Sequence, residues 1–410
     1  MSLTEPASIR GDTDLRERAQ RVLPGGATHA ARSYDPRIYV ARSSGSRKWL
    51  VDGTELIDYT MGHGALLLGH AHPKVVEAVR EQVSRGTHYG AANPLEVEWA
   101  ELITTLVPSA DKVRFTASGT EAVMLALRVA RAATGRDRIV KLDEHFHGWS
   151  DEVSAFIGAD GATRTPAGVP QVLGTLTTVV PADDPAKLEA ALAMGDVAAV
   201  ILEPSGAHYG RIPIDPAFIR AAREACSATG TVLVFDEVVT GFRVSPGGMQ
   251  QLLGITPDLS VLGKVMAGGL PGGAVAGRED LLELLATTIE HYGTFNANPL
   301  SAAAGITTLR LVADGGPQRT ADTYAQSLQR EWSAALIAAG IPGSVTRLSS
   351  ILHIKLADPV AQAKLSNAMR AERIDPLHTS AFCSAVHTIA DLEQSAAAFA
   401  RAIVSASAPS

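Results

Sequence analysis

The sequence predicts an α/β protein with a mostly parallel, doubly wound sheet in a large domain and a small α+β domain built from both ends of the chain. Between residues 62 and 299, apolar runs of strand length alternate with segments of helical periodicity, as is typical of a doubly wound sheet. The run at 197–202 is apolar throughout, which indicates a parallel strand covered on both faces. Outside these limits the pattern changes. We therefore divide the chain into 1–61, which joins the small domain, 62–299, the large domain, and 300–410, the C-terminal small domain.

The small domain is predicted from signals at the two ends of the chain. The first twenty residues indicate an exposed arm followed by a short charged helix. Asp52 and Gly53 then separate two β-type runs and form a strong hairpin signal. The expected strands here are 38–40, 48–51, 56–59 and, near the C-terminus, 350–355. The expected C-terminal helices are 299–312, 320–339, 361–371 and 392–404.

The large domain is predicted to contain alternating strands and helices. The expected strands are 112–115, 138–142, 197–202, 231–235 and 259–262, and the expected helices are 73–85, 96–107, 119–133 and 218–229. The helix at 119–133 is apolar on nearly all sides, so we expect it to be buried. In open α/β sheets, ligands bind beyond the carboxyl ends of the strands. Residues that directly follow these strands are therefore the candidates for a functional site.

Composition limits the classes of protein to which the chain can belong. It has 410 residues, of which 46% are hydrophobic, and a net charge of -7, which argues against a nucleic-acid-binding protein. Its two cysteines, Cys226 and Cys383, form no disulfide framework and indicate a reducing compartment. The polar N-terminus does not resemble a signal peptide, and no apolar run reaches the roughly 18–20 residues that span a bilayer. We expect a cytoplasmic protein that acts on small molecules and binds neither nucleic acid nor membrane.

Two candidate ligand sites follow the predicted strands 112–115 and 231–235. Ser118, Gly119 and Thr120 open a helix, where hydroxyls and close backbone approach suit a phosphate. Ser118 and Glu121 also fit a plain capping box. Asp236 ends the second strand, where it can meet a ligand or cap the next segment. These residues alone leave both interpretations of each site open.

Lys264 is the candidate reactive amine among eight lysines. It follows the apolar strand 259–262 and precedes the glycine-rich segment 266–273. Most lysines are solvated surface groups. A lysine in apolar surroundings has a lowered pKa and can act as a nucleophile or base.

Two loops complete the set of candidates. His145, Phe146 and His147 follow strand 138–142 and can stack on a planar ligand or pack as an ordinary loop. No further ligands at metal spacing accompany these histidines, so we expect no metal site. Thr294 can donate to a phosphate or belong to the turn before Pro299. The sequence contains no Walker lysine motif, GxGxxG or GxSxG, so it supports neither nucleotide binding nor an α/β-hydrolase.

Together these residues match the needs of one cofactor, pyridoxal 5'-phosphate (PLP). Its phosphate needs helix-end N–H groups and hydroxyls, its ring an aromatic face, its pyridine nitrogen a carboxylate, and its aldehyde an amine. The candidates supply each group, and all of them follow predicted strand ends. The set therefore indicates a PLP enzyme, although each residue alone has a plain structural explanation.

The sequence resembles the class-III aminotransferases of PLP fold type I, and within them the glutamate-1-semialdehyde 2,1-aminomutase branch. The resemblance runs from about residue 24 to residue 392. The motifs that carry it include LGHAHP at 68–73, RFTASGTEA at 114–122, LEP at 202–204, FDEVVTGFR at 235–243, LGKVMAGGLPGGAVAG at 262–277 and GTFNANPLSAAAG at 293–305.

The resemblance implies a role for each matching residue. The cofactor-binding positions are Ser118, Gly119 and Thr120 for the phosphate, Phe146 and Val238 for the two ring faces, Asp236 for the pyridine nitrogen, and His147 and Glu203 within the lining of the site. Lys264 would hold PLP as a Schiff base and move the proton. Thr294 would reach the phosphate of the neighbouring subunit, which implies a homodimer with shared active sites.

The substrate positions depart from the aminomutase pattern. Arg32 matches the residue that holds a substrate carboxylate. His63 stands where the aminomutases usually have Trp, and His208 where they usually have Asn. The C-terminal FEAGF motif reads as 378–382 HTSAF, which loses the acid.

These departures order the candidate functions. We predict an aminotransferase that moves an amino group between an amine or amino acid and a carbonyl compound. An intramolecular aminomutase is the alternative. A non-catalytic scaffold is a third hypothesis, which the presence of Lys264 disfavours. Racemisation and decarboxylation use the same cofactor residues and stay open.

Overall fold

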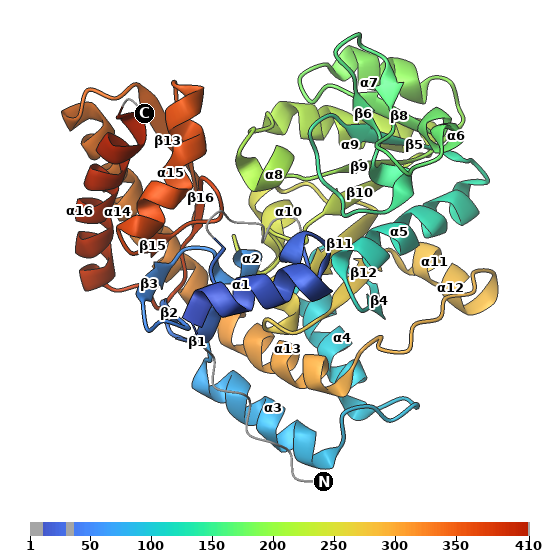
Figure 1. Cartoon of the computed structure of the whole chain (residues 1–410). Helices are drawn as coiled ribbons and strands as arrows, with labels where there is room; N and C mark the ends of the chain where they lie inside the picture. The colour runs from blue at the N-terminus through green and yellow to red at the C-terminus, as the bar shows by residue number, and fades with distance from the viewer. Residues whose placement is uncertain (1–10, 30–36, 409–410) are drawn as a thin grey trace.

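The computed structural model describes residues 11–29 and 37–408 and shows an α/β protein of two lobes (Figure 1). The smaller lobe contains the C-terminal helices and stands beside a larger lobe built on a central sheet. Helix α1 (Gly11–Val22) and the short 3-10 helix Pro24–Gly26 begin the described chain. Among residues 11–29 and 37–408, no helix combines the length and the apolar character needed to cross a membrane.

The largest sheet in the described chain has seven strands in the order β4-β12-β11-β10-β9-β5-β8. Its strands are β4 (Lys112–Thr116), β5 (Arg138–Leu142), β8 (Thr177–Val180), β9 (Val197–Leu202), β10 (Val232–Asp236), β11 (Leu259–Gly263) and β12 (Gly273–Gly277). Strand β12 runs antiparallel to both of its neighbours, and the others are parallel. The predicted mostly parallel sheet is confirmed.

Helices cover both faces of this sheet. Strand β9 shows the alternation, since Ala199 and Ile201 belong to the core under α5 whereas Val200 and Leu202 pack toward α9. The helices in this part of the sequence, not all of which lie on the sheet, are α2 (Met61–Gly64), α3 (Pro73–Arg85), α4 (Pro94–Leu106), α5 (Gly119–Thr134), α6 (Gln171–Thr175), α7 (Pro185–Leu192), α8 (Ala207–Gly210), α9 (Pro216–Thr229), α10 (Gly248–Leu253), α11 (Glu279–Leu282), α12 (Leu284–Thr287) and α13 (Pro299–Val312). Short elements between them are the 3-10 helices Asp151–Val153 and Lys264–Ala267 and the pair β6 (Phe156–Ile157) and β7 (Thr163–Arg164).

Several helices begin at an Asx-Pro pair, which corrects three predicted starts. Helices α4, α9 and α15 (Pro359–Ala371) were each expected two residues later. In all three, proline occupies the first turn, where its missing N–H costs nothing. The side chains of Asn93, Asp215 and Asp358 accept a backbone N–H just inside the helix. The cap therefore extends each helix beyond its apolar periodicity.

The smaller lobe combines both ends of the chain. One sheet has the order β1-β2-β3-β15 and another the order β13-β14-β16. Their strands are β1 (Val40–Ser44), β2 (Arg47–Leu50), β3 (Glu55–Asp58), β13 (Gly343–Leu348), β14 (Ile351–Leu356), β15 (Ile374–Asp375) and β16 (Ser380–Phe382), packed with α14 (Gly316–Ala338) and α16 (Ile389–Ser407). Strand β15 pairs in parallel with β3, so the N-terminal hairpin joins the C-terminal segment. The domain boundaries at 61/62 and 299/300 stay predictions.

The predicted strand at 38–40 is wrong. Strand β1 covers Val40–Ser44, and Val40 pairs with Leu50 at the end of β2. The Val51 N–H also donates to the Tyr39 carbonyl oxygen at 3.0 Å, but residues 38 and 39 do not belong to the strand. A register irregularity follows between Val40 and Arg42. After this irregularity, Arg42 pairs with Trp49, and its guanidinium lies 3.6 Å from the centre of the Trp49 ring. This cation–π contact favours the pairing of β1 with β2 on the C-terminal side of Val40.

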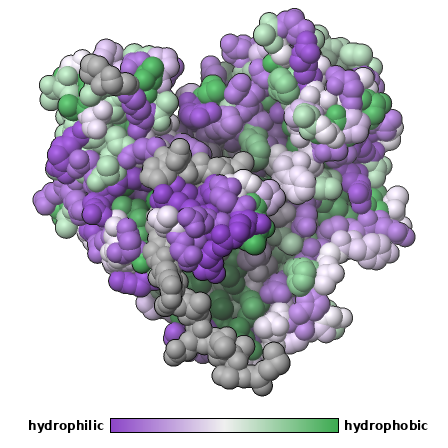
Figure 2. Space-filling model, viewed as in Figure 1, coloured by the Kyte–Doolittle hydropathy of each residue, from purple (hydrophilic) through white to green (hydrophobic). Residues whose placement is uncertain are grey.

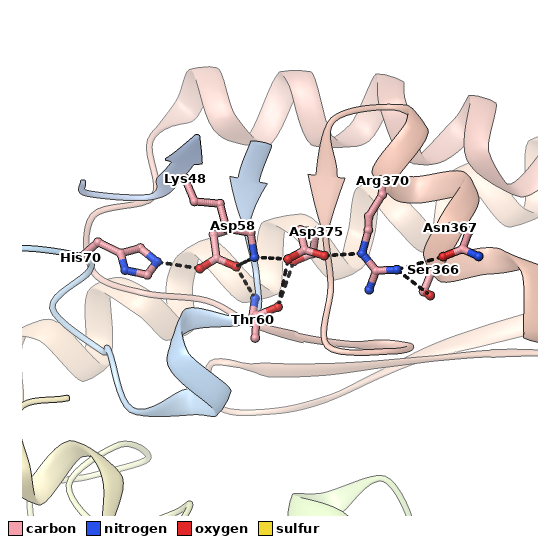
Figure 3. A network of polar contacts seen from close by, with 8 residues as sticks. All are labelled: Lys48, Asp58, Thr60, His70, Ser366, Asn367, Arg370 and Asp375. Atoms are coloured by element: carbon pink, nitrogen blue, oxygen red, sulfur yellow. Dashed lines mark hydrogen bonds and ion pairs between the residues drawn. The ribbon is translucent and has the colours of Figure 1, made fainter. Parts of the chain in front are cut away.

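A buried network of charged groups ties the N-terminal hairpin to the C-terminal segment (Figure 3). Lys48 Nζ donates to Asp58 Oδ1 at 3.1 Å and also to Asp375 Oδ2. Arg370 Nε donates to Asp375 Oδ1 at 2.5 Å, and His70 Nε2 lies 2.6 Å from Asp58 Oδ2. Burial acts to lower the pKa of Lys48, but the charges of the two carboxylates outweigh it and raise that pKa. The network therefore holds β2, β3, β15 and α15 together through paired charges.

Candidate active site

The candidate site lies at the carboxyl edge of the large sheet. Strands β4, β5, β9, β10 and β11 all point toward this edge, because the single reversed strand β12 restores the direction of β4. Asp236 is the last residue of β10, and the segments that follow the other four strands carry Ser118, His145, Glu203 and Lys264. Side chains from distant parts of the sequence thus lie at the carboxyl edge of one sheet, as we predicted from the sequence.

The N-terminus of α5 presents Ser118, Gly119 and Thr120. Ser118 Oγ accepts the Glu121 N–H at 3.2 Å, and Glu121 Oε2 accepts the Ala117 N–H at 2.6 Å. The capping interpretation is therefore correct for Ser118. Because a hydroxyl that accepts can still donate, the cap leaves its proton available to an anion.

Two glycines let neighbouring loops lie close to this helix start. A Cβ on Gly119 would lie 2.9 Å from Val238 Cγ2, and a Cβ on Gly148 would lie 2.5 Å from Thr120 Oγ1. Gly148 also has a φ of +87°, which disfavours other residues. The loop after β5 and the segment after β10 are thereby pressed against the N-terminus of α5.

Asp236 is a buried carboxylate with two partners. Its Oδ2 lies 2.8 Å from His147 Nδ1, and its Oδ1 accepts the Val238 N–H at 3.1 Å. Burial lowers the pKa of His147, and the hydrogen bond and charge of Asp236 oppose that change. His147 Nε2 is buried without a hydrogen-bond partner. Asp236 is therefore oriented at the strand end by its neighbours and keeps lone pairs for a ligand.

Lys264 directly follows β11 and adopts a left-handed backbone conformation with a φ of +51°. Such a conformation is uncommon for a residue with a Cβ and clusters at functional sites. Within the described chain, no hydrogen bond or ion pair engages its amine. Burial lowers the pKa of that amine, the charges of Asp236 and Glu203 oppose the change, and Arg243 adds to it. The site therefore holds an unpaired amine near two carboxylates.

Glu203 acts as a clamp between two loops. Its Oε1 accepts the N–H groups of Phe146 at 2.9 Å and His208 at 3.1 Å, and its Oε2 accepts the Tyr209 N–H at 2.8 Å. Burial, followed by the charge of Asp236, raises the pKa of Glu203 to about 7 against the effect of these hydrogen bonds. The sequence motif predicted that Glu203 lines the site, but nothing in it revealed these three backbone partners.

His145 supports the same clamp from the other side. Its Nδ1 accepts the Glu203 N–H at 2.9 Å, and its Nε2 is buried without a partner. Burial, with the charges of His147 and Lys141, lowers the pKa of His145 to about 2, so the ring is neutral. Among the described residues, no group of three His, Cys, Asp or Glu side chains is arranged to hold a metal ion.

Two of the three predicted substrate residues, His63 and His208, lie within the described part of the chain. Arg32 lies outside the described residues. His63 has a φ of +56°, and its ring centre lies 5.7 Å from that of His29. His208 Nε2 lies 3.8 Å from Glu144 Oε2, at the edge of the Glu203 clamp.

Phe146 and Thr294 lie on the outside of the single chain. The Phe146 side chain is 61% exposed, although its N–H is held by Glu203. Thr294 is exposed, and its carbonyl oxygen lies 2.5 Å from His88 Nε2. In the described part of the chain, no hydrogen bond joins Thr294 to the N-terminus of α5. The proposed contact of Thr294 with the phosphate of a neighbouring subunit stays a prediction.

The chain matches the sequence model of the family described as Aminotransferase class-III over residues 29–379. The chain belongs to the class-III aminotransferase family. This match spans all five strand ends at which the candidate site lies. The predicted family resemblance and PLP fold type I are confirmed.

Individual relatives cover between 83% and 98% of the chain. A glutamate-1-semialdehyde 2,1-aminomutase of Methanopyrus kandleri is 42% identical over 350 residues, which cover 83% of this chain and 81% of the relative. The structure of an omega-transaminase from Sphaerobacter thermophilus is similar with a TM-score of 0.91 and 35% identity, covering 98% of this chain and 99% of that one. A transaminase with PLP bound is similar with a TM-score of 0.91 and 33% identity, covering 96% and 97%.

The protein is thus a PLP-dependent enzyme, either a transaminase or a 2,1-aminomutase. The residues present fit this cofactor. Lys264 offers a buried amine whose pKa is lowered by burial, Asp236 offers an oriented carboxylate, and Ser118 offers a hydroxyl at the N-terminus of α5. This class-III member therefore carries the groups that PLP chemistry requires at one edge of its sheet.

Proposed function

We propose that the protein is an aminotransferase that moves an amino group between an amine or amino acid and a carbonyl compound, with PLP held by Lys264 as a Schiff base. The supporting observation is the unpaired amine of Lys264 at the same sheet edge as Asp236 and the N-terminus of α5. When bound, PLP supplies an electron sink for the substrate carbon.

Lys264 and Asp236 are the proposed catalytic residues. An amine whose pKa is lowered by burial is a better base near neutral pH, so Lys264 is suited to move a proton once the substrate amine has replaced it. The Asp236 carboxylate would keep a proton on the pyridine nitrogen, with His147 fixing its orientation. Both roles follow from charge and position.

The remaining cofactor residues are proposed to bind and orient. Ser118, Gly119 and Thr120 would hold the phosphate through hydroxyls and helix-end N–H groups. Phe146 and Val238 would cover the two ring faces. Glu203 would act by holding the loop that carries Phe146 and His147.

The substrate side favours a transaminase over a mutase. His63 and His208 differ from the residues that aminomutases usually carry at these positions, as does the C-terminal 378–382 segment, which lacks the acid. We propose that Arg32, His63 and His208 contact the substrate. Altered contacts on the substrate side, with the cofactor side retained, accord with a different substrate pair.

An intramolecular aminomutase is the second candidate, because the Methanopyrus kandleri relative carries that name. The two functions differ in their need for a second substrate. Holoenzyme mixed with a single amine should lose its visible absorbance and stop after one half-reaction, and should recover only when a carbonyl acceptor is added. Complete conversion of glutamate-1-semialdehyde with no added acceptor would instead establish the mutase.

We also propose a homodimer with shared active sites. Four aromatic side chains on the segments after β5 and before α13 are exposed in the single chain: Phe146 by 61%, Trp149 by 82%, Tyr292 by 84% and Phe295 by 62%. A second copy would cover these rings and bring its Thr294 to the phosphate. Light scattering at micromolar concentration should give twice the 42.9 kDa of one chain, and a monomer that retains activity would refute the shared site.

The proposed location is the cytoplasm, with amines, amino acids and carbonyl compounds as partners. Both cysteines, Cys226 and Cys383, are buried and unpaired, which accords with a reducing compartment.

A further inference from the structure

The turn that carries His208 and Tyr209 forms one wall of the space between the two lobes. Helix α8 lies at the side of the large lobe that faces β16, and Figure 2 shows a notch between the lobes (Figures 1 and 2). The Tyr209 ring centre lies 5.5 Å from that of His353 on β14 and 5.2 Å from that of Phe382 on β16. The turn therefore contacts the small-domain sheet directly.

Hydrogen bonds fix this contact. His353 Nδ1 lies 2.9 Å from Ser380 Oγ, and His353 Nε2 lies 3.3 Å from the Tyr209 carbonyl oxygen. Burial lowers the pKa of His353 to about 4, so the ring is neutral near pH 7. A neutral ring with Nε2 protonated can donate to Tyr209 and accept from Ser380 at once. The contact between the turn and the small-domain sheet is thus held by His353 and Ser380, which carry no charge near pH 7.

The same turn is connected to the catalytic lysine. Glu203 accepts the backbone N–H groups of His208 and Tyr209, and its charge acts on Lys264. Glu203 therefore links the backbone of this turn to the surroundings of Lys264.

Arg211 follows the turn and has no assigned role. Its side chain is exposed, and within the described residues no hydrogen bond or ion pair engages its guanidinium. Its backbone N–H donates to the His208 carbonyl oxygen at 3.3 Å, which fixes its place beside the turn. An arginine without an anionic partner at the mouth of an enzyme site is a candidate for binding the anionic part of a substrate.

The charge of Arg211 acts on side chains from three separate segments. After the effect of burial, it lowers the pKa of His208 and of His353, and it also contributes to lowering that of His378. These three histidines lie on the turn itself, on β14 and on the segment before β16. The acid beside this cluster is Glu144, which pairs with His208 at 3.8 Å.

We propose that Arg211 determines specificity by binding the carboxylate of an amino-acid or oxo-acid substrate at the notch between the lobes. The proposal rests on the proposed amino-transfer function and adds a substrate class to it. The guanidinium fork matches a carboxylate in shape and charge. Arg211 approaches from the β9 side, through the turn that Glu203 holds, and is a position distinct from Arg32.

The test compares Arg211→Gln and Arg211→Lys with a matched control, Arg220→Gln. Arg220 lies exposed on α9, and within the described residues no hydrogen bond or ion pair engages its side chain. Propionate binding to each holoenzyme is measured by titration calorimetry. Half-reactions then compare alanine with alanine methyl ester and pyruvate with methyl pyruvate, which separates the amino donor from the acceptor as the source of the carboxylate.

We expect Arg211→Gln to weaken propionate binding at least about tenfold and to raise KM for alanine, pyruvate or both by a similar factor. KM for the matching ester should change less than about twofold, and Arg211→Lys should recover part of the loss because it keeps a charge without the fork. Arg220→Gln should behave as the unaltered protein.

Two results would overturn the proposal. One is the absence of measurable propionate binding to the unaltered holoenzyme, and the other is equal binding by Arg211→Gln and Arg220→Gln. If the unaltered enzyme transfers no amino group between any pair, the proposed function fails, and the calorimetric comparison still decides whether Arg211 binds a carboxylate.

Discussion

Replacement of Glu203 by Gln tests how the site is held together. The carboxylate accepts three backbone N–H groups, from Phe146, His208 and Tyr209. The amide keeps the oxygen that serves Phe146 and His208, and places an NH2 group where Oε2 accepts the Tyr209 N–H at 2.8 Å. Two donors then face each other in a buried position.

The magnitude follows from the bond that is lost. A hydrogen bond to a charged group contributes about 1.5–3 kcal/mol, and a buried unsatisfied donor adds about 1–3 kcal/mol. We therefore expect the free energy of opening the turn at 204–212 to fall by about 3 kcal/mol. Since about 1.4 kcal/mol is a factor of ten, amide exchange in this turn should accelerate roughly 100-fold.

Hydrogen–deuterium exchange of peptides covering 204–212 is the assay. At pH 8, above the Glu203 pKa of about 7, the comparison is between a carboxylate and an amide. Glu144→Gln is the matched control, because Glu144 is exposed and its 3.8 Å pair with His208 should contribute less than about 1 kcal/mol. Equal exchange in the two variants would show that the Glu203 carboxylate does not hold the turn.

Three further perturbations test other parts of the account. Asp236→Asn removes the charge proposed to keep the pyridine nitrogen protonated, so kcat should fall by a factor on the order of 10² while the cofactor still binds. Near-normal turnover would mean that another group pairs with the nitrogen. Burial keeps His145 neutral with a pKa of about 2, so the unfolded chain takes up a proton below pH 6.5 that the folded chain does not. Stability is therefore lost as the pH falls below 6.5. In His145→Asn, the free energy of unfolding measured in urea should depend less steeply on pH, by up to about 1.4 kcal/mol per pH unit. An unchanged slope would contradict a neutral His145. Lys48→Met leaves two buried carboxylates without their shared cation and should lower the free energy of unfolding of the apoprotein by about 3–5 kcal/mol. The exposed Lys187→Gln is the control and should lower it by less than about 0.5 kcal/mol. Similar losses in the two variants would show that the network of Figure 3 is not stabilising.

Much of the large domain could be predicted because its strands are continuous apolar runs. The bounds of β5, β9 and α3 agree with those expected from the sequence. Strand β12 was not expected, since its sequence GAVAG lies in a glycine-rich segment and glycine disfavours strands. Tertiary contact explains it, because a Cβ on Gly273 would lie 2.3 Å from the Ser118 carbonyl oxygen. Only a glycine allows β12 to begin so close to α5.

The site was predictable where chemistry follows a strand end, and not where it depends on contacts between loops. Lys264 and Asp236 follow apolar strands, so their shared edge was foreseeable. The three N–H groups on Glu203 come from two separate loops, and the partners Lys48 and Asp375 are far apart in the sequence. Arg211 carries no motif signal. Such contacts arise from the folded arrangement alone.

The most direct test of the central claim is to locate the covalent bond to the cofactor. Borohydride reduction of the holoenzyme fixes an imine between PLP and a lysine, and peptide mass mapping then identifies which of the eight lysines carries the added mass. We expect the label on Lys264 alone, with no label and no visible absorbance in Lys264→Ala. A label on another lysine, or visible absorbance unchanged in Lys264→Ala, would contradict it.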